Sequence, residues 1–261
     1  SFVENVEPEL KKVGFELNKK VVRSELVGGL DQDRFGILLR DWFADVEIFR
    51  EENVPLQTED TKLGQKYSEI CGAMMVNFDG EEKTMPQMGV YQQNNDRSVR
   101  ESSWRVVAER RLKDRDAIDG IFDKMVVNRN KTAQNAGFED YRGYMFAVKH
   151  RFDYTPDDCI AFHDSIEHKC MPIIRKLASE RKDALGLDTL RPWDMAVDSY
   201  GHEPLKPFDT ADELIEKTSK LFHRMDGGLG DMFDTMRDGG YSLDLASRKG
   251  KAPGGYQASR D

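Results

Sequence analysis

Histidine and glutamate side chains at helical spacing are the first candidates for metal chemistry in this sequence. His163 and Glu167 lie four residues apart, so both can point to one ion from the same helix face. His163 and His168 are five apart, about 140° around a helix, and cannot share an ion. Catalytic zinc normally takes three protein ligands, and the neighbouring sequence offers no third. The pattern favours a surface pair, with a metalloenzyme built on His163 and Glu167 as an alternative.

The other recognisable motifs are incomplete. The stretch HEPLK begins at His202 like an HExxH zinc motif, but Lys206 stands where the second histidine belongs. Pro204 also disfavours the helix that would present both ligands. The sequence contains no GxSxG, Walker or GxGxxG motif. Motif spacing therefore predicts no catalytic residue and no metal site in this chain.

The bulk composition excludes some functions. The 261 residues carry a formal net charge of −9, which argues against a nucleic-acid-binding protein. No apolar run approaches the roughly 18 residues of a membrane span, and no signal peptide is apparent, so we expect no membrane partner. The three cysteines, Cys71, Cys159 and Cys170, are too few for a disulfide framework. We interpret them as small buried apolar residues in a reducing compartment.

The elements that must position any site are mostly helices. Apolar residues recur at three-and-four spacing along residues 31–52, which predicts an amphipathic helix, and the same pattern returns through most of the chain. Asp79-Gly80 between two short extended runs predicts a small β-hairpin from about Met74 to Met85. The fold class is therefore mainly α with one hairpin. We expect helices plus the hairpin over about residues 1–90 and long helices over about 91–261, with no clear internal boundary.

Local signals place several helix ends. Thr155 is the predicted N-cap of a helix, and Pro172 is expected to kink that same helix partway along. Thr210 and Glu213 form a predicted capping box. Gly227 is expected to stop the helix that begins there.

Several stretches, read in order, resemble one protein family. They are TMPQMGVYQQNNDRSVRESSWRVVAER, NAGFEDYRGYMF, RFDYTPDDCIAFHDSIEHKCMPII, LGLDTLRPWDMAV and DLASRKGKAPGGYQAS. The chain resembles the oligoendopeptidase F and thimet oligopeptidase-like zinc metallopeptidases, most strongly from about Thr84 to Ser259. Each motif is weak alone, but their order argues against chance.

The resemblance implies a largely helical, cytoplasmic, two-lobed protein with a deep cleft, which cleaves short peptides. In that family, an HExxH helix and a more distant glutamate hold zinc, and the HExxH glutamate activates the attacking water. This chain contains no HExxH. We therefore expect an internal fragment that forms part of the cleft, binds no catalytic zinc, hydrolyses nothing alone and has the missing catalytic lobe as its partner.

The resemblance also assigns candidate substrate-binding residues. In the family, the zinc motif comes shortly after the segment that matches KAPGGYQ. Gly254 and Gly255 have no side chains to obstruct a peptide that pairs with the backbone, and Tyr256 offers its ring or hydroxyl. The alternative is a tail whose glycines only make a turn. A further alternative for the whole chain is a non-catalytic helical peptide-binding or scaffold protein derived from this family.

Overall fold

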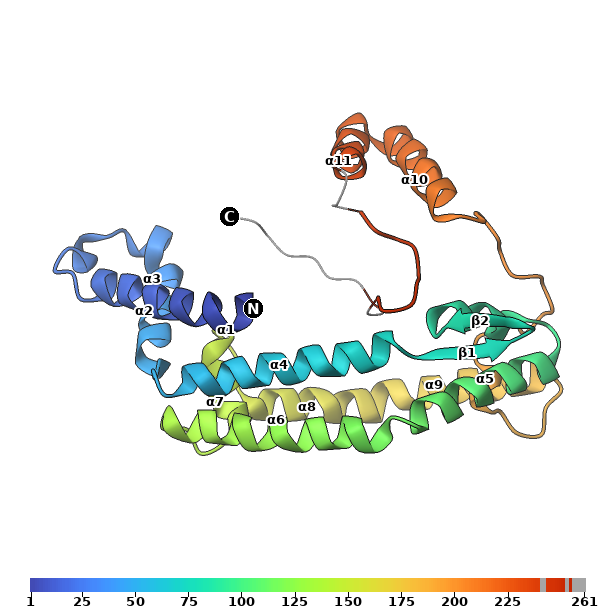
Figure 1. Cartoon of the computed structure of the whole chain (residues 1–261), viewed down its shortest axis with the longest axis horizontal. Helices are drawn as coiled ribbons and strands as arrows, with labels where there is room; N and C mark the ends of the chain where they lie inside the picture. Colours follow the sequence, from blue (N-terminus) through green and yellow to red (C-terminus); the bar gives the residue numbers. More distant parts are fainter. Residues whose placement is uncertain (240–242, 252–253, 255–261) are drawn as a thin grey trace. The chain divides into compact units, whose positions relative to one another are not determined.

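The helices of this protein form where the sequence carries caps and amphipathic spacing, as a computed structural model shows (Figure 1). The structure describes residues 1–239, 243–251 and 254. The α-helices are α1 Phe2–Asn5, α2 Glu7–Val22, α3 Gln32–Ile48, α4 Asn53–Gly72, α5 Arg97–Leu112, α6 Arg115–Asn135, α7 Tyr141–Val148, α8 Pro156–Ser165, α9 Met171–Ala184, α10 Ala211–Met225 and α11 Gly227–Asp238. Short 3-10 helices are η1 Val27–Gly29, η2 Pro86–Gln93 and η4 Pro192–Asp194, and η3 Ile166–Cys170 is a π-helical turn.

The predicted hairpin is present. Strands β1 (Met75–Phe78) and β2 (Glu81–Thr84) pair antiparallel, with Met75 opposite Thr84 and Phe78 opposite Glu81. Asp79 and Gly80 both have positive φ, 54° and 76°, which is the backbone of a tight two-residue hairpin turn. The mainly α fold class with one small hairpin is confirmed among the described residues.

The chain divides into two units, and each is made from two separated segments. Unit 1 comprises Ser1–Ile70 and Asp114–Lys176, and unit 2 comprises Cys71–Lys113 and Leu177–Asp261. In unit 1, Ala133, Ala136 and Tyr144 form a buried cluster from α6 and α7. In unit 2, α5 packs against β1, η2 and η4.

A buried amide ties α4 to α6 within unit 1. Asn53, 1% exposed, begins α4 and donates its side-chain N–H to the carbonyl of Thr132 at 2.9 Å. The side-chain oxygen of Asn53 accepts a hydrogen bond of 2.8 Å from Asn135. Both ends of the Asn53 amide are thus satisfied where water has no access.

Local capping signals were correct at several helix ends. Thr155 caps α8 in a capping box with Asp158, and the Thr210 hydroxyl accepts from the Glu213 N–H. The Glu213 carboxylate, however, accepts from the backbone of Asp209, so the reciprocal half of the predicted box is absent there. At Gly137, φ is 87°, and the α6 helix ends just before it.

One local prediction at a helix end was wrong. Gly227 does not stop a helix, because α10 already ends at Met225 and Gly227 is the first residue of α11. Asp226 makes this possible, since its carboxylate accepts the N–H of Leu229 and caps the second helix. Pro172 lies at the second position of α9, directly after the π-helical turn Ile166–Cys170, and the helix continues past it. The kink at Pro172 stays a prediction.

The cysteines are less buried than the sequence suggested. Cys71 and Cys159 are half-buried, and Cys170 is exposed in the π-helical turn. Similar exposure affects the apolar stripe of α3, in which only Leu39 is buried. Periodicity identified this helix face correctly but not how much of it is covered.

No helix among the described residues is long and apolar enough to span a bilayer.

Candidate functional site

The glycine-rich segment after α11 is anchored to the end of α4 by its backbone. The N–H of Gly250 donates to the carbonyl of Gly72 at 2.8 Å. A Cβ on Gly72 would lie 3.3 Å from both the carbonyl carbon and the oxygen of Gly250. Gly250 itself has φ +81°, a conformation that favours glycine. Two glycines far apart in the sequence therefore permit this close approach.

A local ion cluster shapes the same segment. The Asp244 carboxylate accepts two hydrogen bonds from the Arg248 guanidinium, at 2.8 and 2.7 Å. Lys251 donates to the carbonyls of Asp244 and Ala246. Hydrogen bonds from Arg248, and then from Lys251, hold the pKa of Asp244 well below its ordinary value. These contacts close residues 244–251 into a turn.

A side-chain contact adds a second anchor. The hydroxyls of Ser247 and Thr84 lie 2.8 Å apart, and Thr84 is the last residue of β2. Thr84 is itself buried, and its N–H donates to the Gln87 side chain at 2.8 Å. The segment is therefore held at the hairpin as well as at α4.

Of the predicted substrate-binding residues, the structure describes Gly254. Its φ is +104°, which a residue with a side chain rarely adopts. Gly255 and Tyr256 lie outside the described residues. In the sequence, Gly254 follows Lys251, the last residue of the anchored turn, by three positions. The substrate-binding role of the three residues stays a prediction.

Replacing Gly72 with alanine is expected to detach this anchored turn. The added Cβ meets backbone atoms of Gly250 and Lys251, which cannot rotate away as a side-chain end can. We expect a loss of about 1–2 kcal/mol in unfolding free energy and faster tryptic cleavage after Arg248 and Lys249. Gly64→Ala is the control, since nothing lies within 4 Å of that position in α4 and alanine favours the helix by about 1 kcal/mol. Equal cleavage rates for the two variants would contradict the anchoring role.

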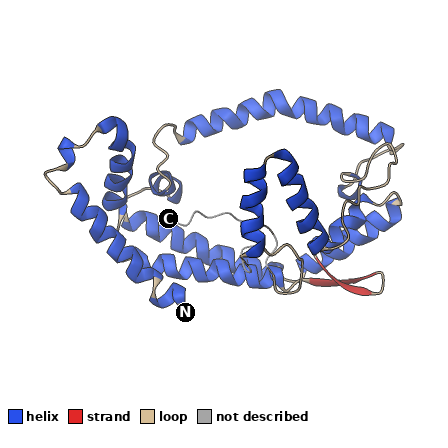
Figure 2. Ribbon diagram, turned by 90° about the horizontal axis from the view of Figure 1, so that it is seen from above, coloured by secondary structure: helices blue, strands red, loops and turns tan. Residues whose placement is uncertain are grey.

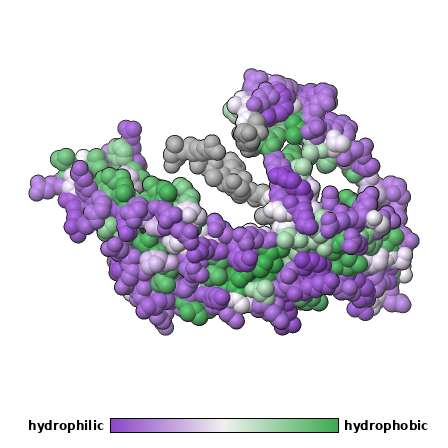
Figure 3. All heavy atoms as spheres, viewed as in Figure 1, coloured by the Kyte–Doolittle hydropathy of each residue, from purple (hydrophilic) through white to green (hydrophobic). Residues whose placement is uncertain are grey.

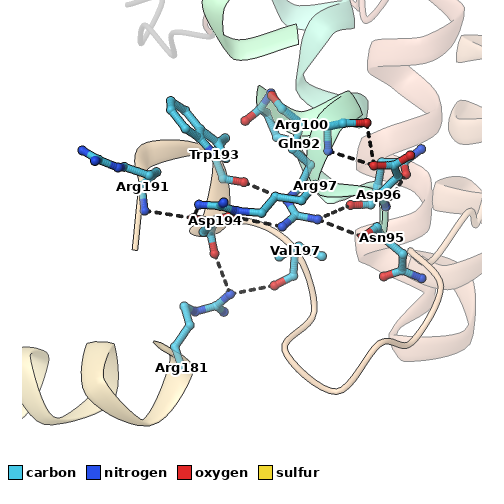
Figure 4. A network of polar contacts seen from close by, with 12 residues as sticks. Gln92, Asn95, Asp96, Arg97, Arg100, Arg181, Arg191, Trp193, Asp194 and Val197 are labelled. Carbon is cyan, nitrogen blue, oxygen red and sulfur yellow. Dashed lines mark hydrogen bonds and ion pairs between the residues drawn. The ribbon is translucent and has the colours of Figure 1, made fainter. Parts of the chain in front are cut away.

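Unit 2 also contains a buried network of charged side chains (Figure 4). Asp194 is fully buried, and its two carboxylate oxygens accept from Arg97 at 2.9 and 2.8 Å. Arg100, only 3% exposed, donates to the same carboxylate at 3.2 Å. The backbone N–H of Arg191 completes the set at 2.9 Å. Four donors on one carboxylate offset much of the penalty of burying its charge.

The arginines of this network also bind the backbone of the neighbouring loop. Arg100 donates to the carbonyls of Asn94, Asn95 and Trp193, and Arg181 donates to those of Asp194 and Val197 (Figure 4). The network thereby fixes the start of α5, η4 and the loop that follows η4. Since Asp194 is inaccessible to solvent, its role is to position these elements rather than to meet a substrate.

The Asp194 pKa predicts a loss of stability in acid. Hydrogen bonds from Arg97, opposed by burial, lower this pKa from 3.8 to about 2. The stabilisation is complete above the unfolded-state pKa and is lost as the pH falls from about 4 through about 2, with a full size of about 2 kcal/mol. Urea unfolding at pH 6 and pH 3 should show roughly half of this contribution gone at pH 3. The Asp194→Asn variant should lack this acid-dependent loss of unfolding free energy. If the variant kept the same loss between pH 6 and pH 3, the loss would not arise from Asp194.

The predicted histidine candidates do not form a site together. His163 and Glu167 are both exposed, and His202 lies in a loop where its ring contacts Asp198 at 3.3 Å. Over residues 1–239, 243–251 and 254, no group of three or more His, Cys, Asp or Glu side chains could hold a metal ion.

Comparison with known proteins identifies the family. The model of peptidase family M3 matches residues 90–259, which include the Arg–Asp network, α10, α11 and the glycine-rich segment. The chain belongs to peptidase family M3. A comparison with curated proteins finds no match.

Solved structures agree with this M3 assignment. A Bacillus anthracis str. Ames protein assigned as an oligoendopeptidase F matches with a TM-score of 0.89 and 22% identity, over 98% of this chain and 46% of that one. PZ peptidase A, solved with an inhibitor, matches with a TM-score of 0.89 and 25% identity, over 98% of this chain and 45% of that one. The oligoendopeptidase-F of Enterococcus faecium is more distant, with a TM-score of 0.53 and 14% identity over 80% and 45%. This chain thus spans less than half of the solved chains that it matches.

Membership of M3 confirms the resemblance that the sequence motifs indicated. The zinc ion that the family implies does not fit the described side chains, which offer no three-ligand group. The Arg97–Asp194–Arg100 network and the Asp244 cluster were not predicted from the sequence. Arg248 and Lys251 lie four and seven residues after Asp244, and this spacing of opposite charges could have indicated the cluster. Asp194 and its arginines lie 94 and 97 residues apart, and no local signal connects them.

Proposed function

We propose that this chain is the helical, cleft-forming part of a cytoplasmic M3 metallopeptidase that hydrolyses short peptides. It supplies no catalytic residue of its own. The catalytic zinc implied by the family resemblance is held by residues of the whole protein outside this chain. The cytoplasmic location rests on the same resemblance.

One observation carries the proposal: the glycine-rich segment is fixed at both Gly72 and Thr84 just before Gly254. A segment that binds extended peptide through its backbone must be held still, because ordering it on binding costs affinity. The positive φ of Gly254 also favours glycine at this position. The matched PZ peptidase A, solved with an inhibitor, supports a peptidase function for the fold.

Within this segment, we assign substrate contact to Gly254, Gly255 and Tyr256. The two glycines leave room for a peptide backbone to approach, and the tyrosine contributes a ring face or a hydroxyl. This arrangement would contact the backbone of the substrate peptide rather than its side chains. It therefore suits an enzyme that accepts short peptides of varied sequence.

Binding of a labelled short peptide to this chain, followed by fluorescence polarisation, tests the proposal. Gly254→Val should weaken binding at least tenfold, because its side chain would occupy the space of the peptide backbone. Gly186→Val is the matched control, since Gly186 also has positive φ, +63°, and nothing within 4 Å. Equal losses in the two variants would attribute the effect to backbone strain and contradict the contact.

The catalytic assignment has a separate test. The chain alone should hydrolyse no peptide, and activity should appear only when the C-terminal part of an M3 peptidase is supplied. Sustained zinc-dependent cleavage by the chain alone would overturn the assignment of catalysis to other residues. Peptide binding without any activity in the combined protein would favour the non-catalytic peptide-binding alternative.

A further inference from the structure

One guanidinium of the buried network in unit 2 is occupied along only one of its edges. Arg97 donates from Nε and Nη2 to the two oxygens of Asp194, at 2.9 and 2.8 Å. An arginine has a second forked edge, formed by Nη1 and Nη2. Nη1 of Arg97 donates to none of the described residues, and the side chain is 40% exposed. Arg97 therefore keeps a pair of donors for another acceptor.

The network also leaves Arg97 with charge to spare and little freedom to move. Asp194 shares its single negative charge between Arg97 and Arg100, so these three groups carry an excess of positive charge. The two bonds to the buried Asp194 carboxylate fix the plane of the Arg97 guanidinium. A ligand that binds the outer edge of Arg97 thus loses little affinity to the ordering of this side chain.

Arg97 lines an open pocket of about 500 Å³, and all the lining residues belong to unit 2. Figure 4 shows Arg97 together with two further lining residues, Asn95 and Val197. The remaining lining comes from the end of α9 and from the loop that follows η4, which belongs to the tan segments of Figure 2. Pockets that hold small molecules have volumes of about 300–1,000 Å³, so this one is large enough for such a ligand.

Asp198 brings a negative charge to the same pocket. Its carboxylate accepts the N–H of Tyr200 at 2.7 Å and lies 3.3 Å from the His202 ring. The hydrogen bond from Tyr200, opposed by burial, lowers the pKa of Asp198, so the carboxylate is ionised at neutral pH. The Asp198 side chain is still 44% exposed and can meet a ligand. The pocket therefore presents one cation and one anion.

Apolar side chains complete the lining of the pocket. Val197 is 2% exposed, and Leu185 and Leu187 are half-buried. Apolar residues reach the surface in several places, as the green areas of Figure 3 show, so an apolar lining does not by itself identify a site. The distinguishing feature here is the combination of an apolar lining with two opposite charges, because a few polar groups in an apolar pocket orient a ligand.

We propose that this pocket binds a small zwitterion with an apolar side chain, either a free α-amino acid or a dipeptide. The ligand carboxylate pairs with the outer edge of Arg97, and its ammonium group pairs with Asp198. The apolar side chain of the ligand packs against the leucines and Val197. Asp198 disfavours a simple anion and Arg97 disfavours a simple cation, so the pocket selects a ligand that carries both charges.

This site is separate from the one assigned to the substrate. None of its lining residues belongs to the glycine-rich segment that contains Gly254. The inference therefore goes beyond the proposed function and does not depend on it.

Isothermal titration of the whole chain with L-leucine and with leucyl-leucine, each up to about 10 mM, tests the inference. We expect at least one of them to bind, and the tighter of the two identifies the size of the ligand. The N-acetyl form of that ligand lacks the ammonium group, and its amide form lacks the carboxylate. Each capped form should bind at least tenfold more weakly than the parent ligand, because one of the two charged contacts is lost.

Two variants assign these contacts to residues. Asp198→Asn should weaken binding of the parent ligand at least tenfold and leave the N-acetyl form unchanged. Asp188→Asn is the matched control, because Asp188 is exposed in the same region of the chain and does not line the pocket. Both substitutions remove one negative charge, so an effect confined to Asp198→Asn does not arise from the net charge.

Arg97→Lys keeps the positive charge but removes the forked pair of donors. It should weaken the parent ligand at least tenfold and leave the amide form unchanged. Since Arg97 also holds Asp194, circular dichroism must show that this variant is folded. If it does not fold, the capped ligands and Asp198→Asn still decide the outcome.

The inference is overturned if neither leucine nor leucyl-leucine binds, or if the capped forms bind as well as the parent ligand. Normal binding to Asp198→Asn also overturns it. Inorganic phosphate that binds as tightly as the parent ligand would identify a site for anions alone and would likewise contradict the proposal. None of these measurements depends on peptide hydrolysis, so each result leaves the test of the proposed function intact.

Discussion

Asp194→Asn is expected to lower the free energy of unfolding by about 3–5 kcal/mol, the largest effect of any single substitution considered for unit 2. The asparagine is nearly isosteric, so the packing around the site is retained. Arg100, which is 3% exposed, then lies buried without the carboxylate that balances its charge. The loss is large because the remaining arginine cannot reach water.

Urea unfolding followed by tryptophan fluorescence measures this effect, because Trp193 directly precedes Asp194 and lies 5.4 Å from the Trp104 ring. Asp209→Asn is the control. Asp209 pairs with Lys206 on the surface, with side chains 69% and 79% exposed, and such pairs contribute about 0–1 kcal/mol. If both substitutions had similar small effects, the buried network would not be a major source of stability.

Asn53→Ala is expected to lower the free energy of unfolding of unit 1 by about 2–3 kcal/mol. The substitution removes both the donor to the Thr132 carbonyl and the acceptor for Asn135. These groups lie where α4 meets α6, and the Thr132 residue is buried. A polar group left unpaired there pays its full desolvation penalty.

Hydrogen exchange of the α6 amides and urea unfolding followed by circular dichroism are suitable measurements for this substitution. Asn130→Ala on the same helix is the control, because Asn130 is exposed and alanine has the higher helix propensity. We expect Asn130→Ala to be neutral or slightly stabilising. A comparable loss in both variants would mean that the effect arises from helix propensity and not from the buried amide.

Features that depend on neighbouring residues were predictable from the sequence. The hairpin turn at Asp79-Gly80, the cap at Thr155 and the end of α6 near Gly137 all follow from local backbone and side-chain chemistry. The error at Gly227 has the same origin. Glycine after an amphipathic run resembles a helix stop, but the carboxylate of Asp226 restarts a helix there.

The candidate site could be predicted only in part. The glycine-rich segment stands out in the sequence, and the order of the motifs indicated the family that the M3 match confirms. Its anchors did not stand out, because Gly72 and Thr84 are distant from Gly250 and Ser247 in the sequence. One glycine among many gives no sign that a second backbone passes within contact distance.

The sequence by itself determined the helices, the hairpin, the family and the absence of an HExxH motif, because each of these depends on short-range spacing or on motif order. Only the tertiary structure decided which charges are buried together and which apolar faces stay uncovered. In the sequence, Arg97 and Arg100 resemble ordinary surface arginines of a helix. The fold brings Asp194, distant in the sequence, into contact with both. Periodicity likewise marks the apolar side of α10 and α11. Only the packed hairpin shows that Phe222 and Phe233 contact each other within it, whereas Met225 and Met232 stay exposed. The reason is physical: burial is a property of pairs of surfaces, and one strip of sequence specifies only one of them.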